Sequence, residues 1–209
     1  MKSSHCVGEA SVMCEGIEKN TIRRGRNIMG LIIVSWNTKE VNTAGILRVA
    51  DAFGAEEVYF RRRPKSMAAA VGTHNYISYR MFDESEWDSF LAIWHAAGYV
   101  VVAVEQHPSS VLLPMVDLPR DMVCVVGNES GGIPPRILVT VDQIVEIPQW
   151  GLVASLNVAT SAALVAYHWA VTHADMIPRS VNAIRKYAGI QHPFTRVDTL
   201  HASMRGNWG

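Results

Sequence analysis

The chain has 209 residues, of which 49% are hydrophobic and 18% are charged, and its 19 basic residues balance 19 acidic ones. This composition suits one globular domain with a buried core and excludes an intrinsically disordered chain. No apolar run reaches the roughly 18 residues of a membrane span, and the N-terminus has no signal-peptide pattern. We therefore expect a cytoplasmic protein without a membrane span.

The three cysteines, Cys6, Cys14 and Cys124, form neither a CxxC pair nor an even-numbered framework. We expect reduced thiols and no metal site. Zero net charge gives no global attraction to nucleic acid. Basic residues nevertheless cluster at 23–26, at 61–65 and in the C-terminal segment. Because local patches are sufficient for phosphate contacts, charge alone leaves RNA contact and ordinary solvated faces as open alternatives.

In chain order, a polar and irregular segment at 1–27 precedes an apolar run at 28–35, which is typical of a strand buried on both faces. A helix follows, with Asn42 as its N-cap and Gly54 at its C-terminal end. Further patterns predict strands at 57–60, 77–80, 99–104, 122–126 and 144–147, and helices at 87–98 and 133–139.

A last helix is expected from Ser155 to about His173, and it is apolar on nearly all sides, which is typical of a buried helix at an interface. Strands that alternate with helices favour an α/β fold, a mostly parallel sheet with helices on both faces. We expect this domain to span 28–175, between an N-terminal extension at 1–27 and a C-terminal tail at 176–209.

Ligands of such sheets bind outside the carboxyl ends of the strands. One loop in that place follows a buried strand and reads Gly127-Asn128-Glu129-Ser130-Gly131-Gly132. Glycines allow positive φ and close backbone approach to a ligand. The spacing fits neither a GxGxxG dinucleotide loop nor a P-loop. A plain turn with a solvated Glu129 is the alternative interpretation.

A second segment, 147–159, runs from the end of a strand through Gly151 into the last helix. We expect the helix to begin at Ser155, where free N–H groups can hold an anion and the Ser155 side chain can act as a cap. Asn157 then lies in the first turn of an apolar helix, where a polar side chain needs a partner.

A third segment, 42–54, carries Arg48 on the side of its helix away from the apolar face. An ordinary exposed arginine is the common case, and a guanidinium directed at a phosphate is the functional alternative.

Together and in this order, the three segments resemble motifs of the SpoU (TrmH-like) branch of the SPOUT methyltransferases. The segment at 42–54 resembles N-x-G-A-I-x-R-T-A-x-A-F-G, with Asn42 and Arg48 six positions apart. The segment at 127–133 resembles G-N-E-G-x-G-[LI], and the segment at 147–159 resembles I-P-M-x-G-x-x-x-S-L-N-V-[SA]. The resemblance covers about residues 28–173.

The resemblance implies a fold whose C-terminal part is tied in a deep trefoil knot, although most α/β proteins do not thread loops. It implies a homodimer with its site near the subunit interface, and methylation of a ribose 2′-hydroxyl by S-adenosylmethionine. The acceptor would be RNA, with tRNA favoured over rRNA. No metal is expected.

The resemblance also assigns the site residues. Arg48 would hold the target phosphate and help to activate the hydroxyl, and Asn42 would fix the loop that presents Arg48. Glu129 would support the target nucleoside or order its loop, while Ser155 and Asn157 would orient the ribose and the knot loop. The cofactor would contact Val126, Gly127, Asn128, Gly131, Gly132, Ile147, Gln149, Ser155 and Leu156.

Several positions depart from the family motifs. Ala44 and Gly45 invert the usual order, Val49 replaces threonine, Ser130 replaces glycine and Gln149 replaces methionine. We interpret these as substrate or subgroup differences. Three alternatives stay open: methylation of rRNA, methylation of a small nucleoside metabolite, and a non-catalytic RNA-binding module with the same fold.

Overall fold

The computed structural model describes residues 30–36, 39–61, 73, 77–128 and 130–173. The chain divides into two units, Met1–Ala174 and Asp175–Gly209, and the described residues all belong to the first. The expected N-terminal extension, the C-terminal tail, Glu129 and most of the basic cluster at 61–65 lie outside the described residues. Among the described helices, none is long and apolar enough to cross a bilayer.

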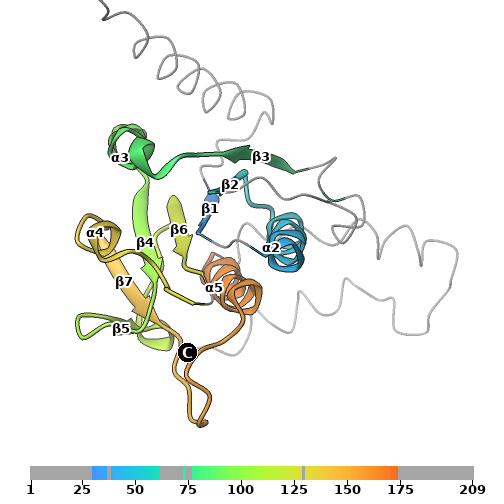
Figure 1. The fold of residues 1–209 in the computed structure, drawn as a ribbon, viewed down its shortest axis with the longest axis vertical. Coiled ribbons are helices and arrows are strands. Elements are labelled where there is room, and N and C mark those ends of the chain that lie inside the picture. Colours follow the sequence, from blue (N-terminus) through green and yellow to red (C-terminus); the bar gives the residue numbers. More distant parts are fainter. Residues whose placement is uncertain (1–29, 37–38, 62–72, 74–76, 129, 174–209) are drawn as a thin grey trace, which may run out of the picture. The chain divides into compact units, whose positions relative to one another are not determined.

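A seven-stranded sheet forms the centre of the described part, in the order β3-β2-β1-β6-β4-β7-β5 (Figure 1). All the described strand pairs are parallel, which confirms the parallel sheet that the alternating pattern predicted. The strands are β1 (Leu31–Ser35), β2 (Glu57–Phe60), β3 (Ser78–Met81), β4 (Val100–Val104), β5 (Val111–Leu112), β6 (Met122–Val126) and β7 (Gln143–Glu146).

Helices cover both faces of this sheet. The α-helices are α2 (Glu40–Phe53), α3 (Trp87–Ala96), α4 (Pro135–Leu138) and α5 (Val158–Thr172), with 3-10 turns η3 (Glu84–Glu86) and η4 (Leu113–Met115). Helices α2 and α5 pack against each other on one face, and α3 and α4 lie on the other (Figure 1). Because every described crossover returns the chain in parallel, the loops that follow β4, β6 and β7 meet at one edge.

The face under α3 and α4 is filled by aromatic side chains, which pack mainly edge to face. Trp36 contacts Phe82 and Trp87 at ring-centroid distances of 5.1 and 5.3 Å. Phe90 and Trp94 of α3 stack at 5.3 Å. Large rings bury much apolar area and prefer such arrangements, so this cluster stabilises the sheet behind the site.

Two helix starts differ from the sequence-based expectation. Helix α2 begins at Glu40 with Lys39 as its N-cap, so Asn42 lies inside the first turn and is not the cap. Helix α5 begins at Val158, and its N-cap is Asn157 instead of Ser155. In both cases the sequence pattern places the cap on a polar side chain a few residues away from the observed one, because such patterns locate helix ends only to within a few residues.

Helix α5 is also less buried than its composition indicated. Val165, Ala166 and Trp169 are buried against the protein, whereas Leu164 and Tyr167 are exposed. The two-residue strand β5 was not predicted, since so short a segment carries no readable period. Strands β2 and β6 have the predicted bounds, and Gly54 ends α2 at φ 70° as expected.

Candidate active site

The carboxyl ends of β6, β4 and β7, which are neighbours in the sheet, border an open cleft of about 200 Å³. The loop after β6 and the loop between β7 and α5 form its other walls. Eight of the nine residues expected at the cofactor line it, namely Val126, Gly127, Asn128, Gly132, Ile147, Gln149, Ser155 and Leu156. Gly131 is exposed and is not among the lining residues.

The loop after β6 is closed by its own backbone. Asn128 and Gly132 exchange two N–H···O bonds of 3.1 Å each. The Asn128 side-chain oxygen accepts hydrogen bonds from the Ser130 and Gly131 amides at 2.9 and 2.7 Å. Such bonds from an asparagine to the backbone hold a turn from inside. The loop therefore has a shape of its own.

At two positions of this loop, steric constraints explain why the residue is glycine. A Cβ atom on Gly127 would lie 2.5 Å from the carbonyl carbon of Gly132, so the two backbone segments touch. Gly132 has φ 61°, a left-handed conformation that favours glycine. These glycines are compatible both with a plain turn and with a loop that binds a ligand. The cleft beside the loop favours the second interpretation.

The loop from β7 to α5 ends at Asn157. The Asn157 side-chain oxygen accepts hydrogen bonds from the Ala159 and Thr160 amides at 3.0 and 3.3 Å and so caps α5. Ser155 is exposed on the cleft wall, which leaves its hydroxyl directed to ligand or solvent. Earlier in the loop, Trp150 and Leu152 are fully exposed.

Asn42 and Asn157 are brought together although 115 residues separate them. The Asn157 Nδ2 donates to Asn42 Oδ1 at 2.8 Å, which supplies the partner that the sequence required for Asn157. Beside this bond, a Cβ atom on Gly45 would lie 2.8 Å from the Ala159 Cβ. The Ala44–Gly45 order therefore has a physical reason, since the close contact of α2 with α5 needs glycine at position 45.

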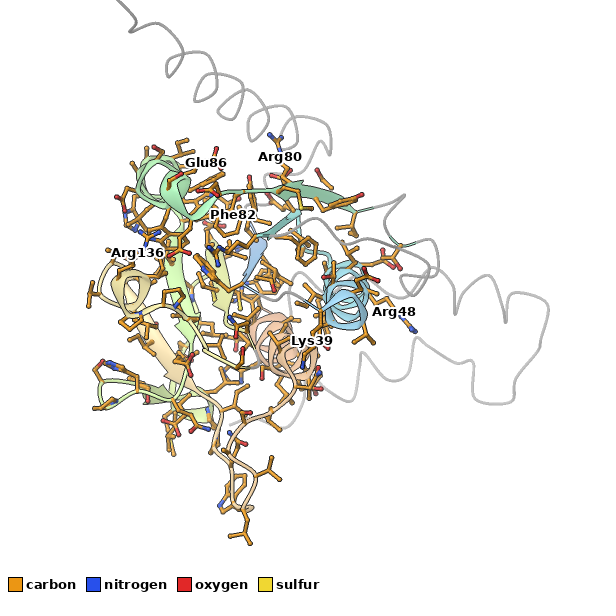
Figure 2. All side chains as sticks on the ribbon, in the orientation of Figure 1. Lys39, Arg48, Arg80, Phe82, Glu86 and Arg136 are labelled. Carbon is orange, nitrogen blue, oxygen red and sulfur yellow. The ribbon has the colours of Figure 1, made fainter. Side chains whose placement is uncertain are left out.

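Arg48 is not brought to the cleft of its own chain. Its side chain is exposed and points outward from α2 (Figure 2). Six positions along a helix correspond to about 9 Å of rise and roughly 120° of rotation, so Arg48 and Asn42 face different directions. Arg48 makes no hydrogen bond or ion pair within the part of the chain that the structure describes.

Seven residues that line the cleft were not among those expected at the cofactor, and Glu105 and Gln106, directly after β4, are the two with side-chain hydrogen bonds to other segments of the cleft. Glu105 Oε2 accepts a hydrogen bond from the Ile133 amide at 2.9 Å, and Gln106 Nε2 donates to the Ala154 carbonyl at 3.0 Å. The sequence does contain a signal for these two residues, because a polar pair directly after a buried strand indicates the carboxyl edge of a parallel sheet.

The basic cluster at 61–65 has one described member, Arg61. It forms an ion pair with Glu84 at 2.8 Å, and Arg136 binds the same carboxylate at 2.8 Å. An exposed arginine that already has an acidic partner attracts phosphate less strongly than a free one. Arg61 by itself therefore does not carry the prediction of an RNA surface.

The described titratable groups with strongly raised pKa values lie in the strands or directly next to them, and none lines the cleft. Burial raises the pKa of the Cys124 thiol in β6 to about 12, so this thiol stays protonated and is unsuited to nucleophilic chemistry. Burial and the neighbouring Glu57 raise the pKa of Tyr59. Among the described residues, no group of three metal-ligating side chains comes together.

Known proteins resemble the chain in both sequence and fold. Mouse (Mus musculus) tRNA (guanosine(18)-2′-O)-methyltransferase TARBP1 is 31% identical over 162 residues, which cover 69% of this chain and 10% of that protein. The chain thus spans about a tenth of the length of this curated relative.

Two solved structures share the fold. The A. aeolicus TrmH/SpoU tRNA modifying enzyme has a TM-score of 0.65 at 23% identity and covers 79% of this chain and 85% of that one. The SpoU methyltransferase AviRb from Streptomyces viridochromogenes, solved with the cofactor AdoMet, has a TM-score of 0.62 at 23% identity and covers 71% and 62%.

The model of the SpoU rRNA Methylase family matches residues 30–167, which include the sheet, the cleft loops and most of α5. The chain belongs to the SpoU rRNA Methylase family.

Proposed function

We propose that the protein is an RNA (ribose-2′-O-)-methyltransferase that uses S-adenosylmethionine, with tRNA as the favoured substrate. The observation that carries the proposal is the cleft itself, because the two loops that match the family's motifs meet there at the carboxyl ends of β6 and β7. The names of the mouse relative and of the A. aeolicus enzyme support tRNA.

The residues of the cleft fit S-adenosylmethionine. Val126, Leu156 and Val158 offer apolar contacts for a flat base, while the loop from 127 to 132 offers backbone groups. Gly127 and Gly132 bring the backbone of that loop into close approach beside the cleft, where it can contact a ligand. When bound, the cofactor supplies an electrophilic methyl group, whose bond to sulfur breaks as the bond to oxygen forms and leaves a neutral thioether.

We assign the other half of the reaction to residues of this chain. A ribose hydroxyl is a poor nucleophile until its proton is removed and its oxygen is aligned with the methyl group. Arg48 binds the target phosphate and favours loss of that proton. Asn157 and Asn42 hold the start of α5 against α2, Ser155 contacts the ribose, and Glu129 orders the acceptor side of the loop.

We further propose that two copies associate, because Arg48 does not lie at its own cleft. Exposed apolar side chains are available for such an interface on α5, at Leu164, Tyr167 and Val171, and on the loop before it, at Trp150 and Leu152. Apolar patches of this kind mark interaction surfaces. A second copy packed on them would bring its Arg48 toward the cleft.

The remaining elements of the proposal come from the family resemblance. They are a trefoil knot in the C-terminal part of the fold, a catalytic domain at 28–175 with a tail at 176–209, and a cytoplasmic setting without a metal.

The proposal is tested by incubating the protein with methyl-labelled S-adenosylmethionine and separate pools of tRNA, rRNA and free nucleosides. We expect label in tRNA, on a ribose 2′-oxygen. Label in rRNA alone changes the substrate, and label only in the nucleosides contradicts an RNA substrate. Cofactor binding without transfer to any pool favours the non-catalytic module.

A further inference from the structure

Glu105 occupies an unusual place in the cleft. It follows β4 directly, and its amide donates to the Val145 carbonyl at 3.0 Å, so its backbone is held between β4 and β7. The carboxylate reaches across to the loop after β6, where Oε2 accepts from the Ile133 amide at 2.9 Å. Oε1 accepts from the Gln106 amide at 3.1 Å. The carboxylate is therefore held at a defined position in the cleft wall.

The Glu105 carboxylate occupies the space that a side chain at position 132 would need. A Cβ atom on Gly132 would collide with Glu105 Oε2. The left-handed φ of 61° at Gly132 and the absence of a side chain there together leave room for the carboxylate.

The charge of Glu105 has no counterpart in the cleft. Among the described residues that line it, Glu105 is the only one with a charged side chain, and the others are apolar, amide, hydroxyl or glycine residues. Both of its hydrogen bonds come from backbone amides, and no lysine or arginine of the described chain forms an ion pair with it. A partly enclosed cleft with one fixed negative charge attracts a cation.

We propose that Glu105 makes the cleft selective for a sulfonium nucleoside over the corresponding neutral thioether. The inference rests on the proposed function and adds a specificity residue to it. S-adenosylmethionine carries one positive charge that S-adenosylhomocysteine lacks. The Glu105 carboxylate therefore favours the substrate form of the cofactor and gives the product less attraction, which helps its release.

The Glu105 charge should affect cofactor binding and not accelerate methyl transfer. The attraction weakens as the positive charge leaves the sulfur, so it stabilises the bound reactant more than the transition state. We expect Glu105 to lower the KM for the cofactor without raising kcat. This makes Glu105 a specificity residue and not a general base.

The test is calorimetric titration of S-adenosylmethionine and S-adenosylhomocysteine into the wild-type chain and Glu105→Gln. The substitution removes the charge, keeps an oxygen that can accept from Ile133 and replaces the second acceptor, which faces the Gln106 amide, by an NH2 group. We expect the Kd for S-adenosylmethionine to rise about fivefold, the size of one charge attraction even when water screens it. The Kd for S-adenosylhomocysteine should change less than twofold. The selectivity ratio, the Kd for S-adenosylhomocysteine divided by the Kd for S-adenosylmethionine, should therefore fall.

The matched control is Asp51→Asn, which removes one exposed carboxylate near the C-terminal end of α2 that does not line the cleft. It should leave both constants unchanged. Equal weakening of both ligands by Glu105→Gln contradicts the inference and reduces Glu105 to a support of the loop. Unchanged constants for both also contradict it.

A second variant guards against misfolding. Glu105→Asp keeps the charge. Its selectivity ratio should stay nearer the wild-type value than that of Glu105→Gln, even if both variants melt at lower temperatures than the wild type. A selectivity ratio of Glu105→Asp as low as that of Glu105→Gln contradicts the inference. A wild-type chain that binds neither nucleoside contradicts the proposed function as well, whereas binding without selectivity contradicts the inference alone.

Discussion

The two halves of the proposed site differ in how they are built. The cofactor half is a cleft whose loops are held by short hydrogen bonds within one chain, as at Asn128 and Glu105. The acceptor half rests on Arg48, which projects from an exposed helical face away from that cleft. The first half is preorganised by the fold, and in the proposed dimer the second half comes from the other copy. Cofactor binding and methyl transfer should therefore be separable by substitution.

The largest expected effect is the loss of methyl transfer in Arg48→Ala. General acid–base and charge contributions of one residue commonly amount to about 100-fold or more. Cofactor affinity should stay within about twofold, because Arg48 does not line the cleft. Rate measurements with labelled cofactor and tRNA check the first part, and calorimetry checks the second. Wild-type transfer rates in this variant would show that Arg48 has no role in the reaction.

Mixing two impaired variants tests whether the two halves of a site come from different chains. The assay uses a cofactor concentration well below the wild-type Kd, at which Gly127→Ala alone should keep about a tenth of wild-type activity. If Arg48 serves the cleft of a partner, co-refolded Arg48→Ala and Gly127→Ala chains form some dimers with one complete site. About a quarter of wild-type activity is expected, since half of the dimers are mixed and one of their two sites is complete. A mixture no more active than the average of the two separate variants would place Arg48 and the cleft of the same chain in one site.

The next largest effect is on the cofactor half. Gly127→Ala places a methyl group 2.5 Å from backbone atoms of Gly132, and no side-chain rotation relieves this collision. The loop must open, and we expect cofactor affinity to fall about tenfold, the cost of roughly 1.4 kcal/mol of lost contacts. Calorimetric titration measures it.

The control for this substitution is Gly151→Ala in the other loop. A Cβ atom there meets nothing within 4 Å, so affinity should be unchanged. A comparable loss in both variants would indicate general loop sensitivity and not the close approach at Gly127.

A smaller effect is expected where the two halves meet. Asn157→Ala removes the cap of α5 and the bond to Asn42. Loss of an N-cap costs about 1 kcal/mol of unfolding free energy, and the lost bond to α2 adds to it. Urea unfolding measures the change. Asn157→Asp keeps an acceptor for the cap and should lose less, and equal losses in the two variants would contradict the capping role.

The last effect appears only at alkaline pH and concerns the pH dependence of stability. The pKa of Cys124 is about 12 in the folded chain, above the ordinary value of 9.0. The unfolded thiol therefore loses its proton first, and this contribution to stability is complete below pH 9 and is lost between about pH 9 and 12. The slope in that window is about 1.4 kcal/mol per pH unit.

Replacing the thiol isolates this contribution. Cys124→Ala should remove it from the pH profile of urea unfolding, although the cavity lowers stability at every pH. An unchanged alkaline slope in Cys124→Ala would assign the pH dependence to other groups.

Local patterns were sufficient for much of the fold. The alternation of apolar runs and helical periods predicted the parallel sheet, and the bounds of β2 and β6 agree with the prediction. Glycines and asparagine after β6 predicted a loop of special conformation, because φ preference and turn chemistry are properties of a few neighbouring residues. The nine expected cofactor residues lie in two short segments, and eight of them line one cleft.

Only the tertiary structure decided which distant residues meet. The bond between Asn42 and Asn157 spans 115 residues, and the carboxylate of Glu105 reaches the loop after β6 because β4 and β6 are neighbours in the sheet. The outward direction of Arg48 depends on how α2 packs against α5. Strand order and helix packing arise from contacts between remote segments, and a linear pattern of residues does not contain them.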